Sequence, residues 1–131
     1  MSLEPPRPEK QVVDRWNRAF EVLSAEPRRQ LVTSLMDAEP DDPVSLPSAA
    51  QSPVLPADSE ELTVRLHHQH LPMLAAHQYV EWTHEPFQAS RGDNFDELAQ
   101  ILESLYTNAD SLPDDLVHGC SRLEHERSDL E

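Results

Sequence analysis

The feature that most constrains this chain is a set of apolar residues that recur at helical spacing near its start. Residues 12–23 place apolar side chains near i, i+4, i+7 and i+11, with charged and polar residues between them. A second helix is expected after Ser24 as N-cap, with Pro27 in its first turn. The pattern predicts two amphipathic helices, with stripes formed by Val12, Val13, Trp16, Ala19, Phe20 and Leu23 in the first and by Leu31, Val32, Leu35 and Met36 in the second.

The middle of the chain alternates short elements with one long helix. Four prolines between Pro43 and Pro56 favour a short extended piece and a one-turn helix. Asp58 or Ser59 is expected to cap a helix that runs to about Ala76. Pro72 lies inside that helix and predicts a kink over 68–72, because proline removes a backbone hydrogen bond. The expected elements are an extended piece at 44–46, a one-turn helix at 47–51, strands at 79–83 and 87–90, and a helix that Asn94 caps.

This order of elements is that of a winged helix-turn-helix fold, which is mainly α with a small β-hairpin wing (α+β). We expect a disordered leader over residues 1–10 and a winged-helix domain over 11–92. A C-terminal helix over 93–108 is expected to form the dimer interface, and 109–131 to form a weakly ordered acidic tail. The helix over 93–108 has an apolar seam close to a heptad repeat, made of Phe95, Leu98, Ile101, Leu102 and Leu105. Packing of this seam on its own domain is the alternative.

The charge of the chain indicates the solvent to which it is adapted. There are 25 Asp and Glu residues against 10 Lys and Arg, a net charge of −15, and Lys10 is the single lysine. At about 1 M ionic strength the Debye length is roughly 3 Å, so the self-repulsion of such a surface is largely screened. We therefore expect a soluble protein of a high-salt cytoplasm. An acidic disordered protein is the alternative, and it suits only the two ends.

Several functional classes find no support in the sequence. No apolar run reaches the roughly 20 residues of a membrane span, and the first ten residues lack a signal pattern. Cys120 is the single cysteine, so neither a disulfide framework nor a cysteine-based zinc site is expected. The chain has two glycines and therefore no glycine-rich phosphate loop. We expect no enzyme activity, no cofactor, no membrane partner and no small-molecule substrate.

Two stretches resemble small winged-helix proteins of haloarchaea that are similar to ArsR-type regulators. The first is the run from Leu66 to Leu74, LHHQHLPML, followed by Tyr79-Val80-Glu81, and the second is 19–24 with Pro27-Arg28-Arg29. The resemblance covers about residues 12–90. It implies a recognition helix that leads into the first wing strand, and a role as a transcriptional regulator. The chain departs from the family at Gln78, where a glycine usually supplies a left-handed helix end.

The DNA contacts that this resemblance implies fall into two groups. Arg65, His68 and Gln69 lie away from the apolar stripe of the long helix and are candidates for reading base edges in the major groove. Arg28, Arg29 and Arg91 are candidates for phosphate contacts. An ordinary solvated face is the alternative for the first group, and surface ion pairing for the second.

Several histidines lie close together in the sequence, but they give little support for a metal site. His67, His68 and His70 follow one another closely, with His77 and His84 further on, but no cysteine or clustered carboxylate completes a ligand set. His70 falls on the apolar stripe and is better interpreted as a packed core histidine. We therefore expect no metal. The prediction is a homodimeric regulator that binds double-stranded DNA, with two alternatives: an interaction module that has lost DNA binding, and a histidine-based sensor.

Overall fold

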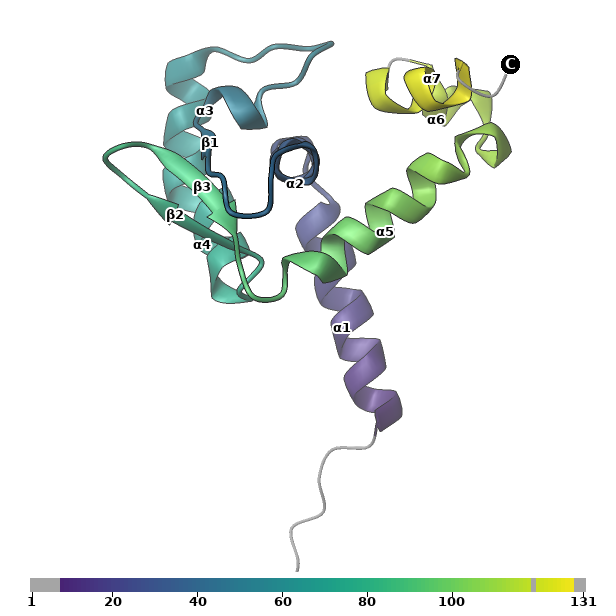
Figure 1. Cartoon of the computed structure of the whole chain (residues 1–131), viewed down its shortest axis with the longest axis horizontal. Coiled ribbons are helices and arrows are strands. Elements are labelled where there is room, and N and C mark those ends of the chain that lie inside the picture. The colour runs from purple at the N-terminus through teal and green to yellow at the C-terminus, as the bar shows by residue number, and fades with distance from the viewer. Residues whose placement is uncertain (1–7, 119, 129–131) are drawn as a thin grey trace, which may run out of the picture.

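The computed structural model describes residues 8–118 and 120–128, and the chain is mainly helical with one small antiparallel sheet (Figure 1). The α+β expectation is therefore confirmed. Two helices open the chain, α1 (Pro8–Leu23) and α2 (Glu26–Asp37). The N-cap residue of α2 is Ala25, one position later than the N-cap predicted at Ser24. Its side chains Leu31, Val32 and Leu35 are fully buried, and Figure 1 shows α2 end-on between the other helices.

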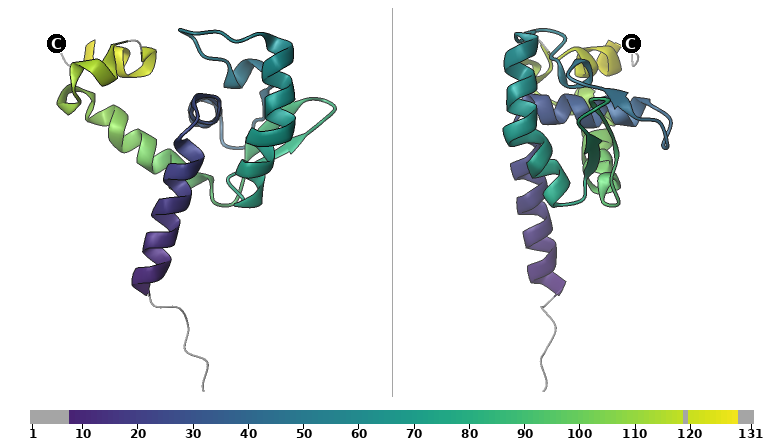
Figure 2. Two further views of the ribbon diagram at one scale, coloured as in Figure 1. Left: turned by 180° about the vertical axis from the view of Figure 1, so that it is seen from behind. Right: turned by 90° about the vertical axis from the view of Figure 1, so that its left-hand side faces the viewer.

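The apolar stripe of α1 is buried only near the C-terminal end of the helix. Ala19, Val22 and Leu23 belong to the core, whereas Val12, Val13, Trp16 and Phe20 are 54%, 55%, 48% and 60% exposed. Figures 1 and 2 show the N-terminal half of α1 extending away from the rest of the molecule. The predicted amphipathic helix is therefore present, but of its stripe only Ala19 and Leu23 belong to this chain's core.

A short strand and a one-turn helix follow, as predicted. Strand β1 (Val44–Ser45) precedes the 3₁₀ turn η1 (Ser48–Ala50). The hydroxyl of Ser34 on α2 donates a hydrogen bond of 2.7 Å to the carbonyl of Ala49, and Ala50 is buried. This contact holds η1 against α2.

The long helix begins where the sequence predicted it and changes its winding halfway. It comprises α3 (Ser59–Arg65), the π-helical turn η2 (Leu66–His70) and α4 (Leu71–Ala76). A carboxylate oxygen of Asp58 accepts hydrogen bonds from the N–H groups of Glu60 and Glu61 at 2.9 and 3.1 Å, which confirms the predicted cap. Within η2 the N–H of Leu71 donates to the carbonyl of Leu66, five residues back.

The wide turn stands where the sequence predicted a kink at Pro72. A π-helical turn advances the chain by less than 100° per residue, so it shifts the face that the following residues present. This shift places Leu71 and Leu74 on the buried side together with Leu62 and Leu66, and all four are in the core. Pro72 itself is exposed.

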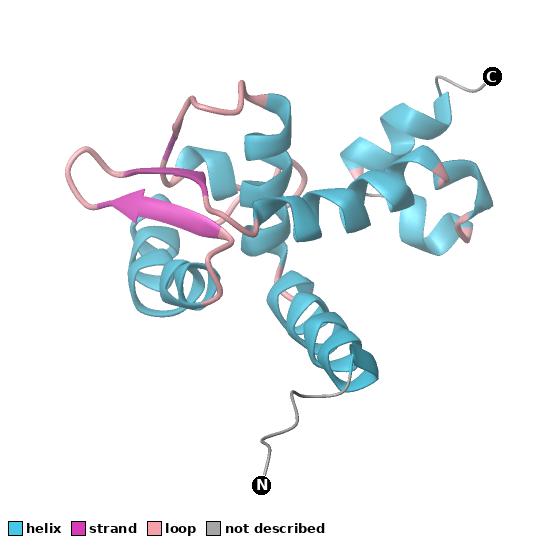
Figure 3. Cartoon of the chain, turned by 60° about the horizontal axis from the view of Figure 1, so that its bottom comes forward, coloured by secondary structure: helices cyan, strands magenta, loops and turns pink. Residues whose placement is uncertain are grey.

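The sheet has the order β1-β3-β2, in which β2 (Val80–Thr83) and β3 (Gln88–Arg91) form the predicted hairpin. Trp82 pairs with Ala89, and Ala89 pairs with Val44 of β1 on its other side. The hydroxyl of Thr83 donates to the carbonyl of Pro86 at 2.6 Å in the connecting turn. Figure 3 shows the hairpin lying alongside the long helix.

The chain leaves the long helix through a left-handed residue. Gln78 has φ 62°, the conformation that glycine supplies in the family that the sequence resembles. Its carbonyl accepts from the N–H of Asn94 at 2.8 Å, and the carbonyl of Tyr79 accepts from Gly92 at 3.0 Å. A Cβ on Gly92 would clash with the carbonyl of Gln78 and lie 2.8 Å from the carbonyl carbon of Tyr79. Glycine at 92 therefore permits the close approach of two backbone segments.

Helices also occupy most of the C-terminal part of the chain. Helix α5 (Phe95–Thr107) is followed by η3 (Ala109–Ser111), α6 (Asp114–Val117) and α7 (Ser121–Ser128). Val117 and Leu123 are buried, and α7 contacts α5. The expected acidic tail is thus helical over much of its length. Of the expected leader, residues 1–7 lie outside the described residues, and α1 begins at Pro8. No helix among the described residues is long and apolar enough to cross a membrane.

Candidate functional site

The candidate face is formed by the outer side of helix 59–76 together with the hairpin 80–91. Arg65, His68 and Gln69 are all exposed there, as the sequence predicted. The guanidinium of Arg65 pairs with the carboxylate of Glu61 at 2.9 Å, one helical turn earlier. Because both side chains are largely exposed, this ion pair holds Arg65 weakly and leaves it available to a partner.

Arg28 and Arg29 do not belong to this face. The Nε of Arg28 donates to the carbonyl of Val22 at 2.6 Å, and Arg29 donates to the carbonyl of Leu23 at 2.7 Å. Both carbonyls lie in the last turn of α1, where no intrahelical donor reaches them. A cation also interacts favourably with the negative end of a helix. The prediction of phosphate contacts from these arginines was wrong for Arg28, which is 3% exposed, and Arg29 has its guanidinium committed to the same helix end.

Arg91 has the same role at the end of α2. Its guanidinium donates to the carbonyls of Leu35 at 2.8 Å and of Ala38 at 3.1 Å, and it lies over the ring of Phe95 at 4.9 Å. Three of the six predicted DNA-binding residues are thus C-terminal helix caps. The predicted wing contact from Arg91 is corrected accordingly, because its donors point into the protein and away from the outer surface of the hairpin.

The structure confirms the prediction that His70 is a core histidine. It is 4% exposed, and its Nδ1 lies 2.8 Å from a guanidinium nitrogen of Arg28. Since arginine can only donate, Nδ1 must be the acceptor and the proton must lie on Nε2. Burial, reinforced by the charges of Arg28 and Arg65, lowers the pKa of His70 to about 4. His70 is therefore neutral at neutral pH and links α2 to the long helix.

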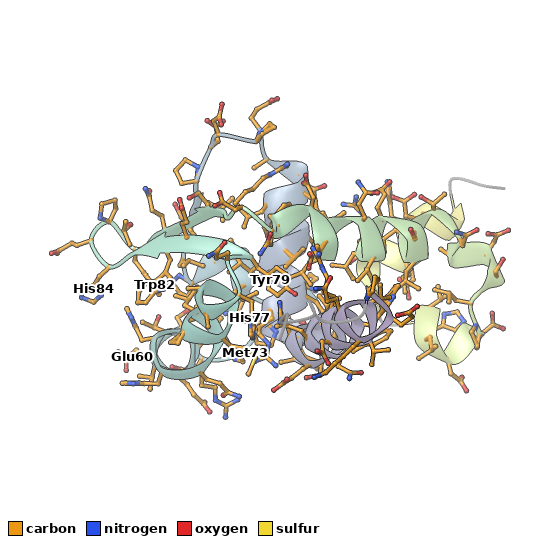
Figure 4. All side chains as sticks on the ribbon, turned by 90° about the horizontal axis from the view of Figure 1, so that it is seen from below. Glu60, Met73, His77, Tyr79, Trp82 and His84 are labelled. Carbon is orange, nitrogen blue, oxygen red and sulfur yellow. The ribbon has the colours of Figure 1, made fainter. Side chains whose placement is uncertain are left out.

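An aromatic cluster joins the long helix to the hairpin. The ring of His67 stacks on Phe87 with centroids 4.5 Å apart, and it contacts Trp82 at 5.4 Å and His84 at 4.9 Å. Burial, with a further contribution from His84, lowers the pKa of His67. Figure 4 labels Trp82 and His84 on the hairpin, beside the helix that carries Glu60. This cluster was not foreseen, although Trp82 and Phe87 flank the predicted turn in the sequence.

The charge of the candidate face is predominantly acidic. In helix 59–76 the charged side chains are Glu60, Glu61 and Arg65, and all three are exposed. The hairpin adds the exposed carboxylates of Glu81 and Glu85, whereas its arginine, Arg91, is turned inward. Four carboxylates thus accompany one available guanidinium. Such a surface repels the phosphate backbone and attracts cationic side chains.

The seam of α5 mostly covers the chain's own core. Phe95, Leu98 and Leu102 are buried at 1%, 0% and 3% exposure, and Ile101 is half-buried. Only Leu105 of the predicted dimer contacts is exposed. Because α2 already covers this seam, the alternative of packing on its own domain is the correct one for the three buried residues.

A hollow of about 820 Å³ lies between α2 and the helices that follow α5. Leu55, Leu105 and Leu116 are exposed on its walls. The hydroxyl of Tyr106 in the wall is hydrogen bonded to Thr33 at 2.9 Å, and burial raises its pKa. The lining is mostly apolar, so the hollow offers contact area more than acid–base chemistry.

No three His, Cys, Asp or Glu side chains among residues 8–118 and 120–128 gather into a group that could hold a metal ion. The histidine cluster at the hairpin has aromatic rings as its neighbours. Comparisons with protein-family models, with curated proteins and with solved structures found no match for this chain.

Proposed function

We propose that this chain is a protein-interaction module on a winged-helix scaffold, with the candidate face as its binding surface and no catalytic step. The element order and the position of the hairpin beside helix 59–76 support the scaffold. The observation that carries the function is the inward orientation of the arginines. Arg28 and Arg91 bind carbonyls of this chain, and Glu60, Glu61, Glu81 and Glu85 are left exposed on the candidate face.

The partner that fits this face presents cationic side chains. Arginine and lysine pair with exposed carboxylates, and they also stack on aromatic rings. Helix 59–76 and the hairpin expose the four carboxylates, and the rings of Trp82 and Phe87 are half-exposed. At molar salt only groups in direct contact retain their attraction, so stacking and hydrogen bonds supply specificity. The expected partner is therefore a protein with a basic segment.

A second candidate is the DNA-binding transcriptional regulator, acting as a dimer in a high-salt cytoplasm. The observation in its favour is the exposure of Arg65, His68 and Gln69 on one helix beside a hairpin. Arginine can read guanine and glutamine can read adenine in the major groove. This candidate requires that a single available guanidinium and two polar side chains replace the usual set of phosphate contacts.

The two candidates respond with opposite sign to the removal of acidic charge. Replacing Glu60 and Glu61 by Gln should weaken binding to a basic protein segment, and it should strengthen binding to duplex DNA. The matched control replaces the exposed Asp96 and Glu103 of α5 by Asn and Gln, which removes the same charge elsewhere. Binding is measured by fluorescence anisotropy at molar KCl, with an arginine-rich peptide library and a random duplex pool as probes. Tighter DNA binding by the first variant alone would overturn the interaction module.

Photo-crosslinking inside cells tests the same question without a chosen probe. A photoreactive amino acid at Gln69 should crosslink to protein, whereas the same amino acid at the exposed Gln100 of α5 should not give those products. Genome-wide DNA capture with the tagged chain provides the counterpart. Reproducible enriched sites that disappear in Arg65→Ala would establish the regulator, since loss of a base contact costs roughly 1–3 kcal/mol.

A further inference from the structure

We infer that the hollow between α2 and the helices after α5 is a binding site for an uncharged, mainly aliphatic small molecule that carries a hydroxyl or carbonyl oxygen. Its volume of about 820 Å³ lies within the range of roughly 300–1,000 Å³ that small-molecule sites occupy. Residues of α2, α5, α6 and α7 line it together with the loop between η1 and α3. In Figure 1 that loop and helices α6 and α7 lie above the end-on helix α2.

The loop that follows η1 forms one wall of the hollow and is braced by its own side chains. The hydroxyl oxygen of Ser52 accepts hydrogen bonds from the N–H groups of Val54 and Leu55 at 3.3 and 3.0 Å. The side-chain amide of Gln51 donates to the carbonyl of Ala57 at 2.9 Å and accepts from its N–H at 2.8 Å. Leu55 is held in this wall with 77% of its surface exposed. The wall is thus preformed, and it presents an apolar side chain to solvent.

Leucines of α5 and α6 add exposed apolar side chains to the same hollow. Leu105 near the end of α5 and Leu116 on α6 are 45% and 62% exposed. Together with Leu55 they come from three segments that lie far apart in the sequence. Single exposed apolar residues are ordinary on a protein surface, but several that converge on one concavity are typical of a ligand site. An aliphatic chain in the hollow would remove these side chains from water.

The charged residues that line the hollow cancel one another. With histidine counted as neutral, the lining carries two arginines, Arg29 and Arg122, and two carboxylates, Glu26 and Asp37. The guanidinium of Arg122 lies 3.0 Å from both carboxylate oxygens of Asp37. Glu26 lies one turn before Arg29 on α2. A lining without net charge, in a chain of net charge −15, favours an uncharged ligand, because a charged group would give up its hydration and meet both signs there.

A pair of hydroxyl groups supplies the polar contact. Thr33 on α2 and Tyr106 on α5 both line the hollow, and their oxygens are 2.9 Å apart. Two hydroxyls share one hydrogen bond, so one of their hydrogens has no partner within the part of the chain that the structure describes. That hydrogen can donate to a hydroxyl or carbonyl oxygen of the ligand. The burial that raises the pKa of Tyr106 also makes such a hydrogen bond stronger than it is in water.

Competition with Nile red, an uncharged apolar dye, tests the inference on the full chain at molar KCl. Straight-chain primary alcohols should displace the dye, and their affinity should rise roughly three- to fourfold for each methylene from hexanol to nonanol. Octanoate and octylammonium have the same chain length as octanol and carry opposite charges. Each should bind roughly tenfold more weakly than octanol, because its charge must be desolvated.

Two leucine variants locate the site. Leu105→Gln and Leu116→Gln should each weaken octanol binding by roughly threefold or more, because each removes apolar surface from the hollow. Val13→Gln is the matched control, since Val13 is 55% exposed on α1 and does not line the hollow, and it should leave octanol binding unchanged. Circular dichroism checks that each variant is folded.

A double variant tests the polar contact. Thr33→Val with Tyr106→Phe removes both hydroxyls, and it should weaken hexanol binding by roughly three- to tenfold. Binding of chlorohexane, which has no hydroxyl, should stay unchanged. Failure of every alcohol to displace the dye, equal affinity for octanol and octylammonium, or loss of octanol binding in Val13→Gln but in neither leucine variant would overturn the inference.

Discussion

A guanidinium nitrogen of Arg28 on α2 lies 2.8 Å from Nδ1 of His70, in the middle of the long helix. Arg28 also donates to the carbonyl of Val22 at the end of α1. One buried side chain therefore joins three helices, and its hydrogen bonds require a neutral imidazole with its proton on Nε2. A buried cation with satisfied donors is stable in place, but removal of one of its partners is costly.

This relationship predicts a loss of stability in acid. The pKa of folded His70 is about 4, against an ordinary value of 6.5. Between these values the unfolded chain binds more protons than the folded one, so stability rises with pH and is fully present above about pH 6.5. Lowering the pH from 6.5 to 4 should cost roughly 1–3 kcal/mol through this group. Urea unfolding at fixed molar KCl across this range measures the slope.

His70→Gln is the informative variant for that slope, because a glutamine oxygen can still accept from Arg28 and does not titrate. The slope between pH 6.5 and 4 should become shallower, and the remainder should come in part from His67, whose pKa burial also lowers. The exposed His68→Gln serves as the control and should keep the slope. An unchanged slope in His70→Gln would show that other groups dominate acid unfolding.

Arg28→Met should destabilise the fold by roughly 2–4 kcal/mol, because it leaves a buried carbonyl and a buried imidazole nitrogen without a donor. Chemical denaturation followed by tryptophan fluorescence measures the loss. Arg65→Ala is the matched control, and its exposed ion pair with Glu61 predicts a change within about 0.5 kcal/mol. Equal effects of the two variants would refute the assignment of Arg28 as an internal donor.

Arg91→Ala should cost roughly 1–3 kcal/mol, since the carbonyls of Leu35 and Ala38 then lose their donor. The same loss should appear with and without any binding partner. If the variant kept its free energy of unfolding but bound a partner differently, Arg91 would be a binding residue of the hairpin and not a cap of α2.

Gln78→Gly should stabilise the protein by about 1 kcal/mol, because φ 62° strains a residue that has a Cβ. Thermal unfolding of the variant measures the gain. Gln100→Gly, in the middle of α5, gives the opposite comparison, because glycine weakens a helix interior by about 1 kcal/mol. A decrease in the unfolding temperature of Gln78→Gly would contradict the strain argument.

The local elements were largely predictable from the sequence because their signals are local. Asp58 caps the long helix through neighbouring N–H groups, and the hairpin follows from its alternating residues and its turn. His70 was placed in the core because it shares the stripe of Leu66 and Leu74. Each of these signals depends on residues within a few positions of one another.

The candidate site was predicted less well, because it depends on groups that no sequence pattern displays. The acceptors of Arg28, Arg29 and Arg91 are backbone carbonyls at helix ends, which any residue can supply. The stripe of α1 has the same spacing whether it faces its own core or solvent. The choice between these environments is made by the tertiary arrangement, which leaves Trp16 exposed and buries Leu98.

The π-helical turn at 66–70 also makes the long helix unusually tolerant of a change in length. Removing one residue from a π-helical turn converts it to an ordinary α-helical one, and the residues after it then continue in the phase of those before it. Loss of the exposed His68 should thus keep Leu71 and Leu74 near the core side, because an ordinary helix needs one residue fewer to bring them there. In α2 the same deletion would turn every later side chain by about 100° and move Leu35 out of the core. A related chain one residue shorter at this point could therefore share the fold with its outer helical surface rearranged.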